Sequence, residues 1–198
     1  MDKDTRAHIL EVALNLFAQQ GLSKTSMNDI VRASGLSKGG VYWHFPSKEA
    51  LILAVYEQFF ELQVAALGQM LAEESASATD RLMRLGQQGG SELAAMVGQF
   101  PSPLEFYAQA MNVPALQALL LRFIGRYRDF IEELVNQGID SGEWRPVDPR
   151  ATADTLIALI EGVLLVWVIA PEQSHLNEQL EASISLLLEG LKNHERDR

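Results

Sequence analysis

Nine residues decide how the N-terminal part of this chain folds: Ser37-Lys38-Gly39-Gly40-Val41-Tyr42-Trp43-His44-Phe45. Serine is a strong helix N-cap, so we expect a short helix to begin after Ser37. The proline that follows Phe45 disfavours helical geometry at that residue, and the helix therefore ends there. Val41 is the inward-facing apolar residue of this helix. A lysine, two glycines and three rings remain for its other faces.

The charge balance around this segment differs from that of the whole chain. The 198 residues carry a formal net charge of −10, yet no acidic residue lies between Ser37 and Lys48. Residues 1–50 have a net charge of +1, and the remaining residues have −11. An acidic surface disfavours non-specific binding to nucleic acid. The two parts of the chain therefore suggest two modules with different partners, and we expect the N-terminal module to contact nucleic acid.

Composition argues against several other classes of protein. The chain has no cysteine, which removes disulfides, thiolate metal sites and thiol nucleophiles. The charged N-terminus runs into an amphipathic pattern, not into the apolar core of a signal peptide. The most apolar run, residues 156–170, contains Glu161 and is shorter than the roughly 20 residues that span a bilayer. We expect a buried helix there, no membrane association and a cytoplasmic protein.

Helix signals also surround the nine-residue segment. Apolar residues at helical spacing predict a helix over residues 4–20, and Gly21 suits the left-handed residue that ends it. Ser26, with Asp29 three residues later, is typical of a capping box at the start of a second helix. Gly35 allows the tight turn before the third helix. A helix, a short helix, a glycine-containing turn and another short helix indicate a helix-turn-helix.

The N-terminal quarter of the chain resembles the tetracycline-repressor (TetR/AcrR) family. Several family positions occur in the family's order, with no insertion or deletion between them. The matching residues are Thr25-Ser26-Met27, Ile30-Val31, residues 35–45 and Ser47-Lys48-Glu49-Ala50-Leu51. The resemblance implies a dimeric, one-component transcriptional regulator that responds to a ligand and is usually a repressor. It also implies an all-helical ligand-binding and dimerisation domain after the fourth helix.

The rest of the chain has helical signals and no convincing strand pattern. A serine-capped helix over about 47–71 connects the two parts. Further helices are expected over 80–100, 104–111, 114–138, 149–170 and 174–193, with a bend or close backbone packing at the glycines of the first. We predict an all-α fold of about nine helices. Residues 1–47 form a three-helix helix-turn-helix DNA-binding domain, and residues 48–198 form the larger ligand-binding and dimerisation domain.

The start of the third helix suits a phosphate, because its free backbone N–H groups lie at the positive end of the helix dipole. Tyr42 and His44 have polar-tipped rings that can reach phosphate oxygens, and Lys48 adds a charge at the start of the next helix. A capping or core role is the alternative for His44. By resemblance, the phosphate contacts are Thr25, Ser26, Ser37, Tyr42, His44 and Lys48.

Other residues of the same helix suit the bases. Gly39 and Gly40 have no side chain to hold the backbone away from the groove floor, although a frayed turn also explains two adjacent glycines. Lys38 suits guanine O6 and N7, and Trp43 suits a thymine methyl group. The alternative for Trp43 is packing on its own domain. By resemblance, the base contacts are Asn28, Lys38, Gly39, Gly40 and Trp43.

The C-terminal part lacks a catalytic constellation. Its histidines are scattered, and no His-Glu-x-x-His or nucleotide-binding glycine motif occurs. We therefore predict no enzyme, no cofactor and no metal. Aromatic residues of the middle helices, with Arg126 and Glu161 in helical phase, suggest a pocket for an apolar or aromatic effector with one polar anchor, although each is also explained as core. The predicted pocket consists of Phe100, Phe106, Tyr107, Met111, Phe123, Arg126, Tyr127, Glu161 and Trp167.

The last two helices carry more apolar residues than one helix face needs. By resemblance, they pair with the same helices of a second chain, and an intramolecular core is the alternative. The expected dimer interface consists of Leu156, Leu159, Ile160, Val163, Leu164, Leu180, Ile184, Leu187 and Leu191.

These expectations combine into a repressor that binds double-stranded DNA as a homodimer at a palindromic operator and is released by a small molecule. Two recognition helices about 34–36 Å apart fit successive major grooves. Ligand would favour an arrangement in which the fourth helix swings and that spacing is lost. The main rival is a DNA-binding architectural or partner-recruiting protein without a ligand, and an α-helical enzyme is a second.

Overall fold

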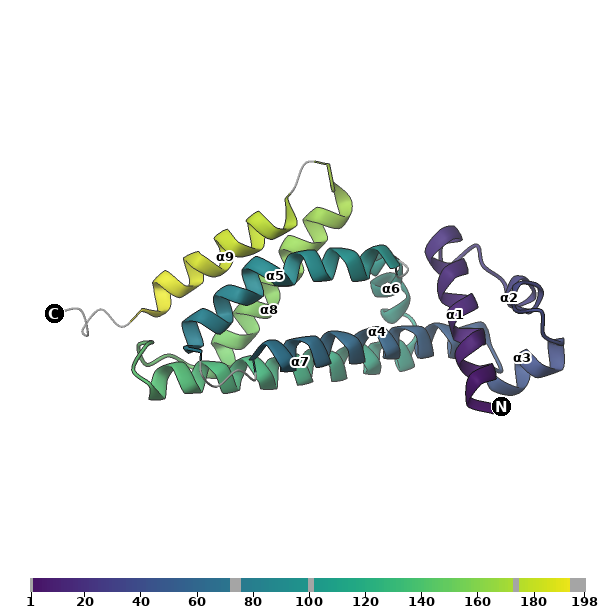
Figure 1. Cartoon of the computed structure of the whole chain (residues 1–198), viewed down its shortest axis with the longest axis horizontal. Coiled ribbons are helices and arrows are strands. Elements are labelled where there is room, and N and C mark those ends of the chain that lie inside the picture. The colour runs from purple at the N-terminus through teal and green to yellow at the C-terminus, as the bar shows by residue number, and fades with distance from the viewer. Residues whose placement is uncertain (1, 72–75, 100–101, 173–174, 193–198) are drawn as a thin grey trace. The chain divides into compact units, whose positions relative to one another are not determined.

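The computed structural model describes residues 2–71, 76–99, 102–172 and 175–192 (Figure 1). Within these ranges the chain forms nine helices, and its β structure is one isolated bridge between Trp144 and Lys192. The predicted all-α class is confirmed. The helices are α1 (Asp2–Gln20), α2 (Met27–Ser34), α3 (Lys38–His44), α4 (Lys48–Leu71), α5 (Ala78–Gln99), α6 (Pro103–Ala110), α7 (Pro114–Asp140), α8 (Pro149–Ile169) and α9 (Leu176–Leu191).

Local sequence signals explain the helix boundaries near the N-terminus. Gly21 follows α1 with φ 83° and Gly35 follows α2 with φ 68°, the left-handed conformation that glycine adopts at low cost. Ser26 and Asp29 form the expected capping box at the start of α2. Phe45 has extended backbone angles and ends α3 before the proline. These predicted boundaries are confirmed.

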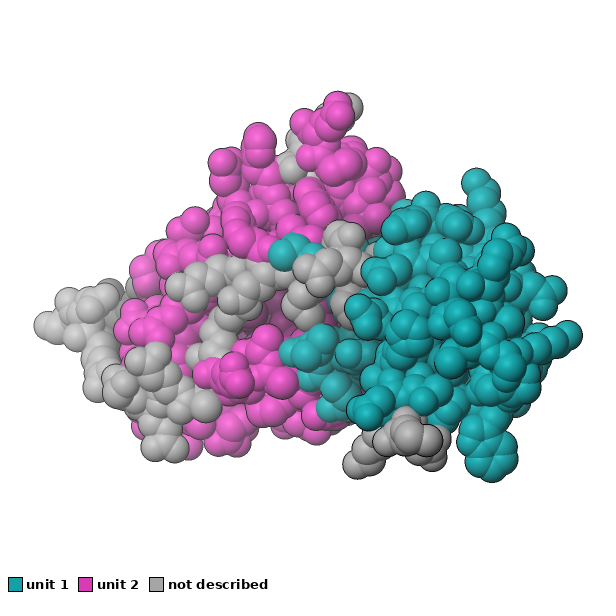
Figure 2. All heavy atoms as spheres, turned by 45° about the vertical axis from the view of Figure 1, so that its right-hand side comes forward, with its two compact units in different colours: residues 1–62, 95–120 teal, residues 63–94, 121–198 magenta. Residues whose placement is uncertain are grey.

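The helices form two compact units, which Figure 2 shows in different colours. Unit 1 comprises residues 1–62 and 95–120, and unit 2 comprises residues 63–94 and 121–198. Unit 1 therefore contains α6 as well as the three N-terminal helices. The predicted boundary after residue 47 does not coincide with this division. The division into compact units does not test which residues bind DNA, so the predicted boundary of the DNA-binding domain stays a prediction.

The core of unit 1 joins α1, α2 and α3 to the first turns of α4 and to α6. Ile9, Phe17, Ile30 and Val41 of α3 are all fully buried. Apolar burial of this kind stabilises the unit by about 1.5–3 kcal/mol for each large side chain. A second part of this core is aromatic, where the rings of α4 and α6 meet.

The core of unit 2 surrounds Trp144 in the α7–α8 loop. Its buried ring packs among residues of α5, α7, α8 and α9, and its indole N–H donates to the Thr79 hydroxyl at 2.9 Å. The adjacent Glu143 carboxylate accepts from the backbone N–H groups of Ala78 and Thr79 at 3.1 and 3.0 Å. Sequence signals place the start of this helix at residue 80. The distant carboxylate caps it two residues earlier, at Ala78.

Glycines in α5 let α9 approach closely, as expected from the sequence. A Cβ on Gly86 would lie 3.1 Å from the Cα of Glu181, and a Cβ on Gly90 would lie 3.1 Å from the Cα of Asn177. Both distances are shorter than ordinary van der Waals contact. These glycines lower the helix propensity of α5, but they allow α9 to pack closely against it.

Replacing Gly90 with alanine should destabilise the protein, because the added methyl group meets the backbone of α9. We expect Gly90→Ala to lower the free energy of unfolding by about 1–3 kcal/mol, the usual cost of overpacking. Gly125→Ala is the matched control, since a Cβ there meets nothing within 4 Å. It should raise stability by up to about 1 kcal/mol. Denaturant unfolding of both variants measures the difference, and equal effects would contradict this description of the α5–α9 packing.

Candidate nucleic-acid interface

The helix α3 is held at both ends and open on its outer face. The Ser37 Oγ accepts from the Gly40 backbone N–H at 3.1 Å, which leaves the hydroxyl hydrogen free to donate outward. At the other end, the Phe45 N–H donates to the Val41 carbonyl at 3.0 Å. The first turn is therefore ordered and not frayed. A Cβ on Gly39 would meet nothing within 4 Å, so packing inside the chain does not require this glycine.

Two of the predicted base-reading side chains lie on the surface of α3. Trp43 is 79% exposed, so it does not pack on its own domain. The Lys38 ammonium lies over the ring of Tyr42, 5.6 Å from its centroid. This cation–π contact is a weak surface interaction, and a guanine or a phosphate can compete for the ammonium. Tyr42 and His44 are half-buried. Lys38 and Tyr42 are therefore in contact with each other on α3.

Ser26, a predicted phosphate contact, already forms hydrogen bonds with Asp29 of the same chain. The Ser26 hydroxyl donates to the Asp29 carboxylate at 2.5 Å and accepts from the Asp29 N–H at 3.2 Å. The hydrogen bond from Ser26 lowers the pKa of Asp29, which keeps this carboxylate ionised at neutral pH. A phosphate must therefore displace Asp29 to receive the Ser26 hydroxyl. Asn28, in the first turn of α2, is exposed.

Thr25 does not lie on the surface. Its side chain is 1% exposed, and its hydroxyl donates to the Gly21 carbonyl at 2.9 Å. It closes the turn between α1 and α2. The hydroxyl is therefore already bonded within the chain, and a phosphate contact of Thr25 stays a prediction. Lys48 is placed as expected at the start of α4, where its ammonium donates to the Ser23 carbonyl at 3.4 Å.

The predicted effector-pocket residues fall in both units. In unit 1, Phe106 is core and packs on its neighbour Tyr107, whereas Met111 is 76% exposed. In unit 2, the rings of Phe123 and Tyr127 lie 5.6 Å apart. Burial, and then the nearby Glu161 carboxylate, raise the pKa of the Tyr127 phenol. The other predicted residues are Arg126, which is exposed, Trp167, which is half-buried, and Phe100, which lies outside the described residues.

Most of the predicted dimer residues pack inside the chain itself. Leu159 and Val163 are the two that line an open groove of about 480 Å³ on the surface of α8 and α9. The other seven are buried or partly buried in the single chain: Leu156, Ile160, Leu164, Leu180, Ile184, Leu187 and Leu191. Five of them belong to the core of unit 2 or pack against it: Leu156, Ile160, Ile184, Leu187 and Leu191.

The groove is also lined by residues that were not predicted from the sequence. On α8 these are the small or apolar residues Ala158, Gly162 and Val166, whose four-residue spacing could have revealed this face. On α9 they are Gln179, Ala182 and Ser183. Ile169 and Leu186 are 66% and 76% exposed on the same two helices.

In the single chain helix α8 is only partly buried, and the burial expected from its sequence stays a prediction that depends on a partner. Two stretches, Lys48–Gln69 and Pro149–Ile169, are long and apolar enough to cross a membrane by length and composition, a test that core helices also pass. Half of the first stretch is buried in the chain, but only 17% of the second. One stripe of α8 packs on the core of unit 2 and the other remains uncovered in the single chain.

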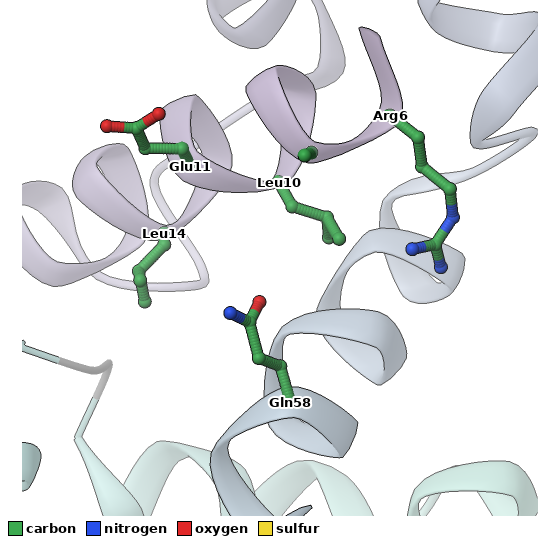
Figure 3. Close-up of a pocket in the computed structure, with 6 residues that line it drawn as sticks. Arg6, Leu10, Glu11, Leu14 and Gln58 are labelled. Carbon is green, nitrogen blue, oxygen red and sulfur yellow. The ribbon is translucent and has the colours of Figure 1, made fainter. Parts of the chain in front are cut away.

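Unit 1 has a further recess of about 500 Å³ between α1 and α4 (Figure 3). Leu10 and Leu14 point from α1 toward Gln58 of α4, and Arg6 lies at one end. The Arg6 guanidinium also lies over the ring of Phe45, 5.1 Å from its centroid. No predicted effector residue lines this recess.

Comparison with known proteins decides the family. Residues 9–55 match the profile described as bacterial regulatory proteins, tetR family, and residues 102–191 match that of the BetI-type transcriptional repressor C-terminal domain. The chain is 30% identical over 199 residues to the HTH-type transcriptional regulator AcrR of Shigella flexneri, covering 94% of this chain and 89% of the relative. The chain belongs to the TetR family. It is also 32% identical to the uncharacterised regulator YfiR of Bacillus subtilis, covering 82% of this chain and 80% of that protein.

Solved structures agree with this TetR-family fold. A transcriptional regulator from Saccharomonospora viridis in complex with choline has a TM-score of 0.83 at 22% identity, and the match covers 97% of this chain and all of that one. SmeT in complex with triclosan has a TM-score of 0.79 at 21% identity, with coverage of 96% and 93%. SmeT is the repressor of a Stenotrophomonas maltophilia multidrug efflux pump. At these identities the likeness concerns the fold.

Truncating Lys48 and truncating Lys38 should change DNA binding in different ways. Lys48→Ala should weaken binding to every duplex and lower the slope of log K against log salt by about 0.9 for each phosphate that is no longer neutralised. Lys38→Ala should instead relax the preference at one base pair, where discrimination is worth about 1–3 kcal/mol. Fluorescence anisotropy at two salt concentrations, on a duplex selected by the wild type and on its single-base variants, separates the two effects. An unchanged salt slope for Lys48→Ala would remove it from the phosphate contacts.

Proposed function

We propose that this TetR-family regulator is a repressor that binds a palindromic operator as a homodimer and is released by a small apolar or aromatic effector. The observation that carries the proposal is α3, which is ordered at both ends, presents Lys38 and Trp43 to solvent, and contains a glycine that no internal contact requires. A DNA groove gives each of these features a use.

In the proposed complex α3 enters the major groove. Lys38, Gly39, Gly40 and Trp43 face the bases, and Asn28 approaches from α2. The phosphate contacts come from Ser37, Tyr42, His44 and Lys48, with Ser26 as a contact only when it releases Asp29. These contacts fix the register of the protein, whereas the first group selects sequence. Such a protein acts on the chromosome and is therefore cytoplasmic.

The uncovered stripe of α8 supports a dimer. An apolar helix face of this size rarely stays exposed in a soluble monomer. In the proposed dimer the α8–α9 groove, lined by Ala158, Gly162 and Val166, receives the same face of a second copy. Small residues there let two helices approach closely. A two-fold interface also explains a palindromic operator, since each α3 reads one half-site.

The effector proposal rests on aromatic residues of α7 and on Glu161 of α8. Phe123 and Tyr127 offer an apolar, aromatic wall, and the Glu161 carboxylate near the Tyr127 phenol offers a polar anchor. Two structural relatives were solved with small molecules, one with choline and one with triclosan. A bound effector shifts the population toward a form with lower operator affinity only if it binds that form better.

A charge in the middle of the α8–α9 groove should break the dimer. We expect Ala158→Glu to sediment as a monomer at micromolar concentration and to lose at least tenfold in operator affinity, since burying an unpaired carboxylate is costly. Ala65→Glu is the matched control, an exposed alanine of α4 outside the groove. Analytical ultracentrifugation distinguishes the two. If Ala158→Glu remains a dimer, the proposed interface is wrong.

Triclosan and choline serve as aromatic and cationic probes of the effector proposal. We expect triclosan to raise the melting temperature of the full chain and to weaken operator binding, because it binds one of two forms preferentially. Phe123→Ala should reduce both responses, whereas Leu121→Ala, at an exposed position of the same helix, should leave them unchanged. Thermal shift and anisotropy measure them. If neither probe acts, the result favours the rival function, DNA binding without a small-molecule ligand.

A further inference from the structure

A single hydrogen bond joins residues that lie far apart in the sequence. The backbone N–H of Leu22 donates to the Glu105 carboxylate at 2.8 Å, across 83 residues. Leu22 follows α1 and lies in the region of the tetR-family profile, whereas Glu105 lies in α6 and in the region of the C-terminal repressor profile. Both residues belong to unit 1. The contact therefore links the two sequence modules inside one compact unit.

The α1–α2 turn is shaped to receive this carboxylate. Gly21 has φ 83°, and a Cβ added there would lie 3.0 Å from the Glu105 Oε1. The Gly21 N–H already donates within the chain, to the Phe17 carbonyl, so the next free amide is that of Leu22. The Leu22 side chain is fully buried. Without Glu105, a backbone N–H beside that buried side chain would lose its partner.

Glu105 itself is held in place by its own helix. It lies in the first turn of α6, near the positive end of the helix dipole. The next residue, Phe106, anchors α6 to α4, since its ring centroid lies 4.0 Å from that of Tyr56. The Tyr56 hydroxyl donates to the Ser102 carbonyl at 3.4 Å. Burial, and then the Glu105 carboxylate, raise the pKa of the Tyr56 phenol, which therefore remains a neutral donor.

The same turn supports the proposed DNA contacts. Thr25 closes it through the Gly21 carbonyl at 2.9 Å, and Lys48 donates to the Ser23 carbonyl at 3.4 Å. Ser26, the N-cap of α2, follows directly. Movement of the turn would therefore displace the start of α2 and the Lys48 ammonium together.

We propose that Glu105 is a positioning residue for DNA binding. Its carboxylate holds the α1–α2 turn in place, so the geometry of the DNA-binding surface depends on the position of α6. This inference rests on the proposed placement of DNA against α2, α3 and the start of α4. It gives α6 a connection to the α1–α2 turn and the start of α2 that does not pass along α4. Because such coupling is reciprocal, DNA bound at the turn must also change α6.

Two conservative variants separate the geometry of this contact from its charge. Glu105→Asp keeps the charge but shortens the reach, so the hydrogen bond to Leu22 is broken. Glu105→Gln keeps the reach and an acceptor oxygen but removes the charge, so the bond is weakened and retained. Glu11→Asp and Glu11→Gln are the matched controls, because Glu11 is an exposed acid of α1 in the same unit.

The test is amide hydrogen exchange of the full chain, with and without a duplex that the wild type selects from a random library. In the free protein, Glu105→Asp should speed exchange at Leu22 about tenfold, with Glu105→Gln closer to the wild type. In the wild type and in Glu105→Gln, the duplex should slow exchange in residues 104–110. In Glu105→Asp that response should vanish while protection of α3 remains, and duplex affinity should fall about three- to tenfold.

Three results would overturn the proposal. They are an unchanged Leu22 amide in Glu105→Asp, a wild-type α6 that does not respond to the duplex, and a response of equal size in Glu105→Asp. Faster exchange throughout α1 and α4 in Glu105→Asp would also overturn it, because it would reveal a general structural role. Failure of the wild type to select any duplex would instead refute the proposed function, and the Leu22 amide would still report whether the contact exists.

Discussion

The recognition helix depends on one buried side chain. The seven residues of α3 include two glycines, and a helix of this length is not stable in water on its own. Val41 is its buried residue, packed at 0% exposure, and Phe45 follows at 3%. The outward-facing residues of α3 are therefore held in place by the burial of Val41 and Phe45 behind them. The exposed Trp43 and Lys38 are not needed for this packing and remain available for the proposed DNA contacts.

Short-range signals in the sequence were sufficient for the framework of this site. The caps at Ser26 and Ser37 and the left-handed glycines at positions 21 and 35 act over four residues or fewer, so they can be predicted from local chemistry. The burial of Thr25 was not predictable in the same way, because a threonine hydroxyl can close a turn or bind a phosphate and local sequence does not distinguish the two. Glu105 was missed because its partner lies 83 residues away.

The C-terminal part illustrates a different limit of prediction. The apolar content of α8 and α9 was clear, but leucine spacing identified the stripe that packs on the chain's own core. The uncovered stripe is instead marked by small residues such as Ala158 and Gly162, which carry little hydropathy. Likewise, the sequence pattern grouped aromatic residues of α6 and α7 into one predicted pocket. In the structure, Phe106 and Tyr127 belong to different units. Which apolar residue meets which neighbour depends on tertiary packing.

Taken together, these features support the proposed dimer of this TetR-family regulator, in which the compact unit that contains α3 also includes α6. Hydroxyl-radical footprinting of the wild-type protein on a selected duplex tests this account most directly. We expect two protected patches related by two-fold symmetry, centred about 34–36 Å apart along one face of the DNA. A single protected patch, or protection without two-fold symmetry, would contradict the dimeric arrangement of the recognition helices.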